Sequence, residues 1–199
     1  MRLIVSGLAC ERGGRALFSG LGFTLEAGEA IVLTGPNGAG KTSLLSILAG
    51  LLEPQAGEAY LEGAEGEEPR LPEDAHLVGH RDGLKSQLLV SENLEFSQAM
   101  FGSPGLSPIA ALDALGLAHV LHIPCAYLSA GQRRRVALAR LLVSRRPLWL
   151  LDEPTAALDR ASRQLLAELL QGHLASGGLM VAATHEPIGI AATEIAIGR

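Results

Sequence analysis

A glycine-rich loop, Gly35-Pro36-Asn37-Gly38-Ala39-Gly40-Lys41-Thr42, lies between the apolar run Ala30 to Leu33 and the helix-forming segment Ser43 to Ala49. This order predicts a strand, a loop and a helix. In that setting the glycines leave backbone N–H groups free to surround phosphates, and the helix N-terminus adds positive potential. We expect Lys41 to reach the β- and γ-phosphates of a nucleotide and Thr42 to bind Mg²⁺. The alternative is an ordinary glycine-rich turn, which the agreement of motif, strand and helix disfavours.

Length and composition favour a globular protein with one domain over residues 1–199. The 199 residues allow one domain or two small ones, and 48% hydrophobic residues can supply a sizeable core. No apolar run reaches the roughly 18 residues that a membrane-spanning helix needs, so no direct membrane insertion is expected. Residues 1–7 are too short an apolar stretch for a signal peptide and predict a first strand instead.

Charge and cysteine content exclude further classes. A net charge of -5 argues against a general nucleic-acid binder and against a protein that adheres to anionic lipid. The basic run Arg133 to Arg135 lies in a predicted helix, where we expect it to face phosphate, acidic partners or water. Cys10 and Cys125 give no disulfide framework, and both are interpreted as free thiols in a reducing cytosol.

Periodicity predicts an α/β fold with a β-rich N-terminal part and a helical insert. Short apolar or alternating runs predict strands over residues 3–8, 17–25, 30–33, 57–63 and 179–183. The pattern turns helical from Ser91 to about Gly116, with Glu92 and Glu95 in the first turn. We therefore place a helical subdomain at approximately residues 86–145 inside the α/β core. The acidic stretch from residue 62 to 74 is expected to be a solvated surface loop.

Two acids follow a second apolar run. Residues 147–151 are continuously apolar, as in a parallel strand buried on both faces, and Asp152 and Glu153 come next. Ligands of open α/β sheets bind outside the carboxyl ends of the strands. Asp152 therefore suits Mg²⁺ coordination, and Glu153 could orient or deprotonate the water that attacks a γ-phosphate. The alternative is a polar strand end that caps a loop.

A histidine and a second helix N-terminus complete the candidate site. His185 follows the predicted strand 179–183, so it is placed on the same sheet edge as the acids, with a satisfied structural histidine as the alternative. Ser129 and Gln132 have the spacing of a capping box at the start of a helix over Arg133 to Val143. Such an N-terminus can bind an anion, although the pattern alone also fits a plain helix start.

Taken together and in this order, these segments resemble the nucleotide-binding subunit of ABC transporters over nearly the whole chain. The resemblance gives Walker A at Gly35 to Thr42, the signature motif at Leu128 to Gln132, Walker B at Leu148 to Asp152, the D-loop at Ala157 to Asp159, Glu153 as catalytic base and His185 as switch histidine. It implies a P-loop NTPase fold with an ABC-ATPase core and mixed or parallel sheet.

The resemblance also implies ATP and Mg²⁺ as ligands and a head-to-tail homodimer. The residues that it assigns to ATP within one chain are Arg12, Gly35, Pro36, Asn37, Gly38, Ala39, Gly40, Lys41, Thr42 and Ser43. Those that face the ATP of the other chain are Ser129, Ala130, Gly131 and Gln132. Catalysis is assigned to Lys41, Glu153 and His185, and Mg²⁺ to Thr42 and Asp152, with His80 as a further candidate ligand.

Two positions depart from the general family pattern. Arg12 stands where most members have an aromatic residue that stacks on adenine, and a planar guanidinium can also stack on a base. His80 stands where most members have the glutamine of the Q-loop, a position that normally contacts Mg²⁺ and signals to the membrane subunit. We therefore expect Arg12 to affect selectivity for the base and His80 to affect signalling to the membrane subunit.

Four stretches, at residues 10–21, 79–85, 92–94 and 128–135, together resemble one subfamily, the ATP-binding subunits of bacterial cytochrome c maturation, known as haem exporters. The resemblance implies a peripheral position on the cytoplasmic face of the inner membrane, integral membrane transporter subunits as partners, and ATP hydrolysis that drives delivery of haem to a periplasmic haem chaperone. Three alternatives stay open: an exporter of another substrate, a soluble ABC-type ATPase that works on ribosomes or DNA, and a module that senses ATP without hydrolysing it.

Overall fold

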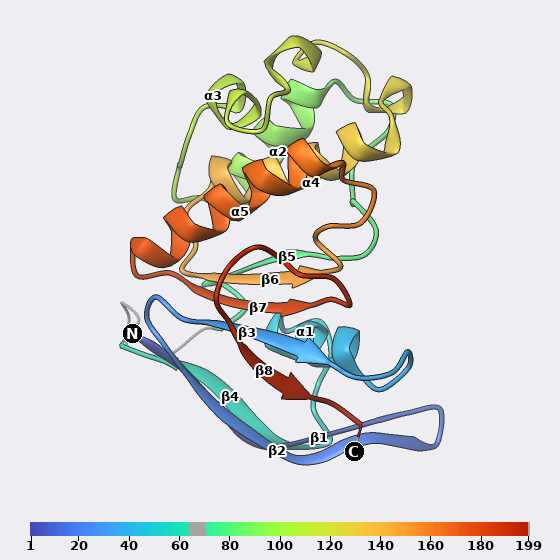
Figure 1. Cartoon of the computed structure of the whole chain (residues 1–199), viewed down its shortest axis with the longest axis vertical. Coiled ribbons are helices and arrows are strands. Elements are labelled where there is room, and N and C mark those ends of the chain that lie inside the picture. The colour runs from blue at the N-terminus through green and yellow to red at the C-terminus, as the bar shows by residue number, and fades with distance from the viewer. Residues whose placement is uncertain (64–70, 199) are drawn as a thin grey trace.

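The computed structural model describes residues 1–63 and 71–198. Figure 1 shows its layers: helices cover one face of a parallel sheet, and helix α1 (Lys41–Leu48) lies between the other face and an antiparallel sheet. Of the predicted acidic loop, Glu65, Glu67 and Glu68 lie outside the described residues. Within the described ranges, no helix is both long and apolar enough to cross a membrane.

The N-terminal part forms the antiparallel sheet. Its three strands are β1 (Arg2–Arg12), β2 (Arg15–Glu26) and β4 (Ala56–Glu62), in the order β2-β1-β4. Gly13 and Gly14, with φ of 59° and 75°, connect β1 to β2. Positive φ at both central residues is what a tight hairpin turn requires, and glycine adopts it without steric cost. The predicted strands 3–8, 17–25 and 57–63 are confirmed, although β1 and β2 extend further.

The parallel sheet positions the candidate site. It contains β3 (Ala30–Thr34), β5 (Ala75–Val78), β6 (Leu148–Asp152), β7 (Leu179–Ala183) and β8 (Thr193–Ala196), in the order β5-β6-β7-β3-β8. Every residue of β6 and β7 is buried, as the apolar runs predict. The register pairs Asp152 with Ala183 and Leu33 with Ala183, so β3, β6 and β7 end side by side.

The helices between β5 and β6 form the predicted insert, but they are broken more often than expected. They are α2 (Val90–Phe101), α3 (Pro108–Asp113) and α4 (Ala130–Val143), with short 3-10 turns at Ala118–Val120 and Cys125–Tyr127. The prediction of one helical stretch from Ser91 to about Gly116 is therefore wrong in its middle, since α2 ends at Phe101 and the next residue, Gly102, has a φ of 65°. Glu92 does occupy the first turn, and its carboxylate accepts the N–H of Leu89 at 2.7 Å.

Two hydrophobic clusters hold the layers together. One joins the parallel sheet to α1 and the antiparallel sheet, with Leu44, Leu150 and Val181 among its fully buried members. The other joins the opposite sheet face to the inserted helices and to α5 (Arg160–Ala175), with Leu138 and Leu151 among its members. Because the insert shares a core with the sheet, a separate subdomain with bounds at 86–145 stays a prediction. Cys10 and Cys125 are buried in different clusters and are free thiols, as predicted.

Buried His76 should make stability depend on pH. Its Nε2 is 2.8 Å from the backbone oxygen of Ser144, and burial lowers the pKa of the ring to about 4. An unfolded histidine binds its proton near pH 6.5, so the unfolded state binds more protons than the folded state between pH 4 and 6.5, and stability falls as pH falls through this window. The two pKa values correspond to about 3 kcal/mol of unfolding free energy lost at the acid end.

Urea unfolding at pH 7 and at pH 4.5 measures this loss. His76→Gln keeps a donor for Ser144 and removes the titration, so we expect a shallower pH dependence than in the parent chain. His122→Gln, at an exposed histidine, is the control that should retain the parental slope. An unchanged slope in His76→Gln would show that the acid sensitivity arises elsewhere.

Candidate functional site

The loop from Gly35 to Thr42 connects β3 to α1 and requires glycine at two positions. Gly35 has φ of 131°, and a Cβ there would lie 2.3 Å from the backbone oxygen of Ile197. Gly40 has φ of 110°, and a Cβ there would lie 3.0 Å from side-chain atoms of Leu17 and Phe18. Any larger side chain would therefore displace the loop from β2 and from the C-terminal segment. The loop keeps a backbone conformation that can surround an anion.

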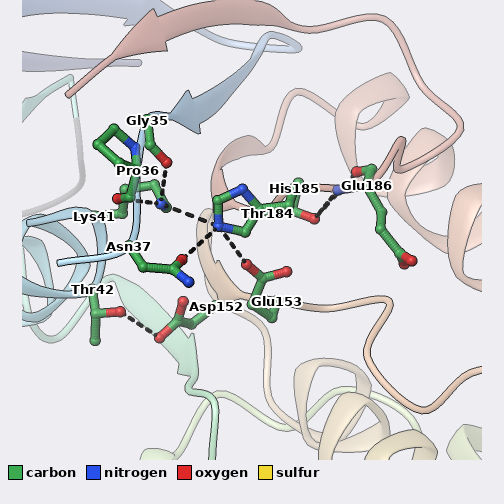
Figure 2. A network of polar contacts seen from close by, with 10 residues as sticks. All are labelled: Gly35, Pro36, Asn37, Lys41, Thr42, Asp152, Glu153, Thr184, His185 and Glu186. Atoms are coloured by element: carbon green, nitrogen blue, oxygen red, sulfur yellow. Dashed lines mark hydrogen bonds and ion pairs between the residues drawn. The ribbon is translucent and has the colours of Figure 1, made fainter. Parts of the chain in front are cut away.

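Lys41 folds back over this loop. Its side chain is 9% exposed, and Nζ donates to the backbone oxygens of Gly35 at 2.7 Å and Pro36 at 3.2 Å. Nζ also lies 3.4 Å from Nε2 of His185 (Figure 2). The ammonium group is thus held by neutral oxygens at the mouth of the loop, where it can attract phosphate.

Thr42 connects the start of α1 to the end of β6. Its hydroxyl donates to Oδ2 of Asp152 at 2.9 Å (Figure 2). Asp152 is 5% exposed, while Thr42 is exposed. A hydroxyl oxygen and a carboxylate oxygen side by side are hard oxygen donors of the kind that Mg²⁺ prefers, so this pair fits the metal that the sequence predicts here.

His185 lies at the centre of a polar network with Glu153 and Asn37. Its Nε2 is 3.1 Å from Oδ1 of Asn37 and 3.7 Å from Oε1 of Glu153. Figure 2 shows the ring between the glycine loop and the acids. A turn after β7 positions His185, because the buried hydroxyl of Thr184 accepts the N–H of Glu186 at 3.0 Å. Thr184 was not among the residues assigned from the sequence.

These groups surround a pocket of about 370 Å³. Its lining residues are Arg12, Leu17, Asn37, Gly38, Gly40, Lys41, Thr42, Ser43, Asp152, Glu153 and His185. All of them except Leu17 were assigned to the site from the sequence. Arg12 is the last residue of β1, so the antiparallel sheet supplies one wall of the pocket.

Other assigned residues lie elsewhere. The capping box is confirmed: Ser129 Oγ accepts the N–H of Gln132 at 3.2 Å, and Gln132 Oε1 accepts the N–H of Ser129 at 2.9 Å. Among the described residues, however, those that line the pocket include neither residues 129–132 nor His80. Ser129 is exposed at the start of α4, and His80 is exposed just after β5. The structure therefore does not bring them to the nucleotide loop of the same chain.

Arg134 is buried beside the site, although the sequence predicted a different environment for it. The run Arg133 to Arg135 was expected to face phosphate, acidic partners or water, but Arg134 is only 3% exposed. Its guanidinium donates to backbone oxygens of Asp152 at 2.6 Å and Glu153 at 2.8 Å. Burial lowers its pKa, which nearby Asp82 partly restores. The sequence did contain a sign of this burial, because Arg134 has the helical spacing that puts it on one face with the apolar residues 137, 138 and 141. All four residues are buried.

Comparison with known proteins identifies the family of the chain. The family model described as "ABC transporter" matches residues 18–156. A Nitrobacter winogradskyi protein named "Cytochrome c biogenesis ATP-binding export protein CcmA" is 57% identical over 198 residues, which cover 100% of this chain and 98% of that protein. A protein of the same name from Rhizobium meliloti is 53% identical and covers 98% of this chain and 96% of its own length.

The fold is shared with solved structures as well. A Pyrococcus furiosus protein described as an ABC transporter (ATP-binding protein) superimposes with a TM-score of 0.83 at 23% identity, covering 99% of this chain and 98% of that chain. The match confirms the predicted fold class, a P-loop ABC-ATPase core with a β-rich N-terminal part. At this identity it is a likeness of fold alone.

Proposed function

The chain belongs to the ABC transporter family as an ATP-binding subunit, which makes it an ABC-type ATPase, and we propose that it serves an inner-membrane transporter of cytochrome c maturation. In this role it couples ATP hydrolysis to the export of haem, or its delivery to a periplasmic haem chaperone. Support comes from the relatives named for cytochrome c biogenesis and export and from the four subfamily stretches. The haem step rests on the subfamily resemblance.

One observation carries the ATPase assignment: Lys41, the Thr42–Asp152 pair and the Glu153–His185 pair meet at one pocket. A glycine loop alone would support binding of any phosphate. A carboxylate beside a histidine at the mouth of the same pocket adds a group that can take a proton from water. Binding and hydrolysis are thereby served by a single site.

Each residue has a distinct part. Lys41 donates to the β- and γ-phosphates, and Glu153 takes the proton of the attacking water. His185 holds the γ-phosphate side of the pocket beside Asn37. The guanidinium of Arg12 covers the adenine ring from the end of β1. Thr42 and Asp152 would hold Mg²⁺, which would neutralise charge on the phosphates.

The sites are completed by a second copy of the chain. Residues 129–132 form a capped helix N-terminus that lies away from the pocket of its own chain, with Ser129 and Ala130 exposed. A head-to-tail homodimer places this N-terminus against the phosphates bound by the partner, where its positive potential stabilises them. Each ATP is then shared by two chains.

Closure of the two chains around ATP is transmitted to the membrane subunits through the loop that contains His80 and through the inserted helices. His80 is exposed at the end of β5, and the loop after it leads into α2. In this proposed assembly the chain is peripheral, on the cytoplasmic face of the inner membrane. His80 would reach the Mg²⁺ site only if its loop approached the pocket.

Purification of the tagged chain from detergent-solubilised membranes tests this function. We expect integral membrane subunits of the cytochrome c system to co-purify, and the complex to release phosphate from ATP in steady state. Recovery with the membrane subunits of another exporter would contradict the haem role, and recovery with ribosomes would favour a soluble ATPase. An intact complex that binds ATP without phosphate release would identify a sensor.

A further inference from the structure

Arg134 of α4 contacts both the acids of the pocket and the loop after β5. Its Nη2 donates to the backbone oxygens of Asp152 and Glu153, at 2.6 and 2.8 Å, and its Nε reaches that of Pro154 at 3.4 Å. Its Nη1 donates to the backbone oxygen of Gly79 at 2.7 Å and to Oδ1 of Asp82 at 3.4 Å. One buried guanidinium thus fixes two segments that are far apart in the sequence.

The backbone of Glu153 needs such support. Its φ is 47°, a left-handed conformation that costs energy for a residue with a side chain and persists only where the surroundings impose it. On one side, its N–H donates to the backbone oxygen of Ala183 at 2.8 Å. On the other side, its carbonyl and that of Asp152 accept from Arg134. Arg134 therefore contacts the backbone from which the Glu153 side chain projects.

The loop from Gly79 to Lys85 is held by the same helix. Besides the contacts of Arg134, Nη1 of Arg140 reaches the backbone oxygen of Asp82 at 3.4 Å. At the far end of the loop, the side chain of Asn93 accepts the N–H of Lys85 at 2.8 Å and donates to its carbonyl at 3.1 Å. Movement of this loop relative to α4 would pull on the guanidinium of Arg134.

We propose that Arg134 is the positioning residue for Glu153 and that it transmits the position of the 79–85 loop to this carboxylate. The inference rests on the proposed function, in which Glu153 is the base. Arginine suits the task because its rigid, planar fork can bond to both segments at once, whereas the three donors of lysine all lie on one nitrogen. Burial in a medium of low dielectric constant strengthens these bonds and makes their loss costly.

Steady-state hydrolysis by the chain in complex with its membrane subunits tests the proposal. Arg134→Lys keeps the charge and loses the fork, so we expect kcat to fall about 10-fold or more, since general-base catalysis contributes about 10²- to 10⁴-fold. KM and the affinity for ATP should stay within about 2-fold, because ground-state binding is not changed. The matched control is Arg135→Lys, whose guanidinium bonds to Leu115 and to neither segment, and it should behave as the parent.

Non-additivity separates positioning from a general loss of structure. In the Glu153→Gln background, Arg134→Lys should lower the residual rate no further, since the group that it positions is already inert. An additional loss equal to that in the parent, or a normal kcat in folded Arg134→Lys, would overturn the proposal. Normal turnover by Glu153→Gln itself would instead refute the base assignment, so the two failures are distinguishable.

A second variant approaches the contact from the loop side, in case Arg134→Lys does not fold. Asp82→Asn removes the charge that faces Arg134 and leaves all of its backbone contacts in place. We expect kcat to fall by about 2- to 5-fold at unchanged KM, the signature of a contact that matters for the transition state alone. An unchanged kcat in Asp82→Asn would exclude transmission through this pair.

Discussion

Glu153→Gln is expected to lower kcat for ATP hydrolysis by about 10²- to 10⁴-fold, the range that a positioned general base supplies. Glutamine has almost the same shape and can still lie beside His185, whose Nε2 is 3.7 Å from Oε1 of Glu153. It cannot accept the proton of the attacking water, however. ATP binding should therefore survive while turnover stops, and ATP should hold the two chains together as a stable dimer.

Phosphate release and gel filtration with ATP measure the two halves of this prediction. The control is Glu168→Gln, at an exposed carboxylate of α5 whose partner is Gln164 at 3.0 Å, and it should hydrolyse ATP at the parental rate. Hydrolysis at a normal rate by Glu153→Gln would remove Glu153 from the role of base. Loss of ATP binding in the same variant would mean that Glu153 holds the pocket open rather than acting in the chemical step.

Most of the pocket could be predicted because its residues follow motifs with local causes. The glycine loop carries its own conformation, and the buried runs of β6 and β7 identify neighbouring parallel strands whose carboxyl ends share an edge. That rule placed Asp152, Glu153 and His185 together without any structural information. Arg12 was located by resemblance alone, since nothing in the local pattern of β1 indicates that its end reaches the loop.

The rest depends on contacts between distant segments. Strand β8 is exposed at all of its residues except the half-buried Ile195, so it lacks an alternating pattern and becomes a strand only by pairing with β3. Strand β5, with four residues, and helix α5 were likewise not predicted. Arg134 was misplaced because a run of three arginines resembles a solvated face, and its five acceptors lie about 20 and 55 residues away in the chain. Sequence spacing cannot convey such partners.

Lys41→Ala is expected to weaken ATP binding by about 10- to 100-fold, since a hydrogen bond to a charged group contributes about 1.5 to 3 kcal/mol. The ammonium group already lies at the loop, held by the backbone oxygens of Gly35 and Pro36, so little reorganisation is needed when phosphate arrives. Lys41→Arg should be intermediate, because it keeps the charge in a larger planar group at a position that is 9% exposed.

Titrations with ATP, ADP and AMP identify what Lys41 contacts. If it reaches the β- and γ-phosphates, the loss should be greatest for ATP, smaller for ADP and negligible for AMP. Arg145→Ala removes an exposed cation at the opposite end of β6 and should bind all three nucleotides normally. An equal loss for AMP would mean that the loop had collapsed without its lysine, and an unchanged affinity for ATP would place the phosphates elsewhere. The gradient across the three nucleotides therefore separates a lost phosphate contact from a lost loop, which a single affinity for ATP cannot do.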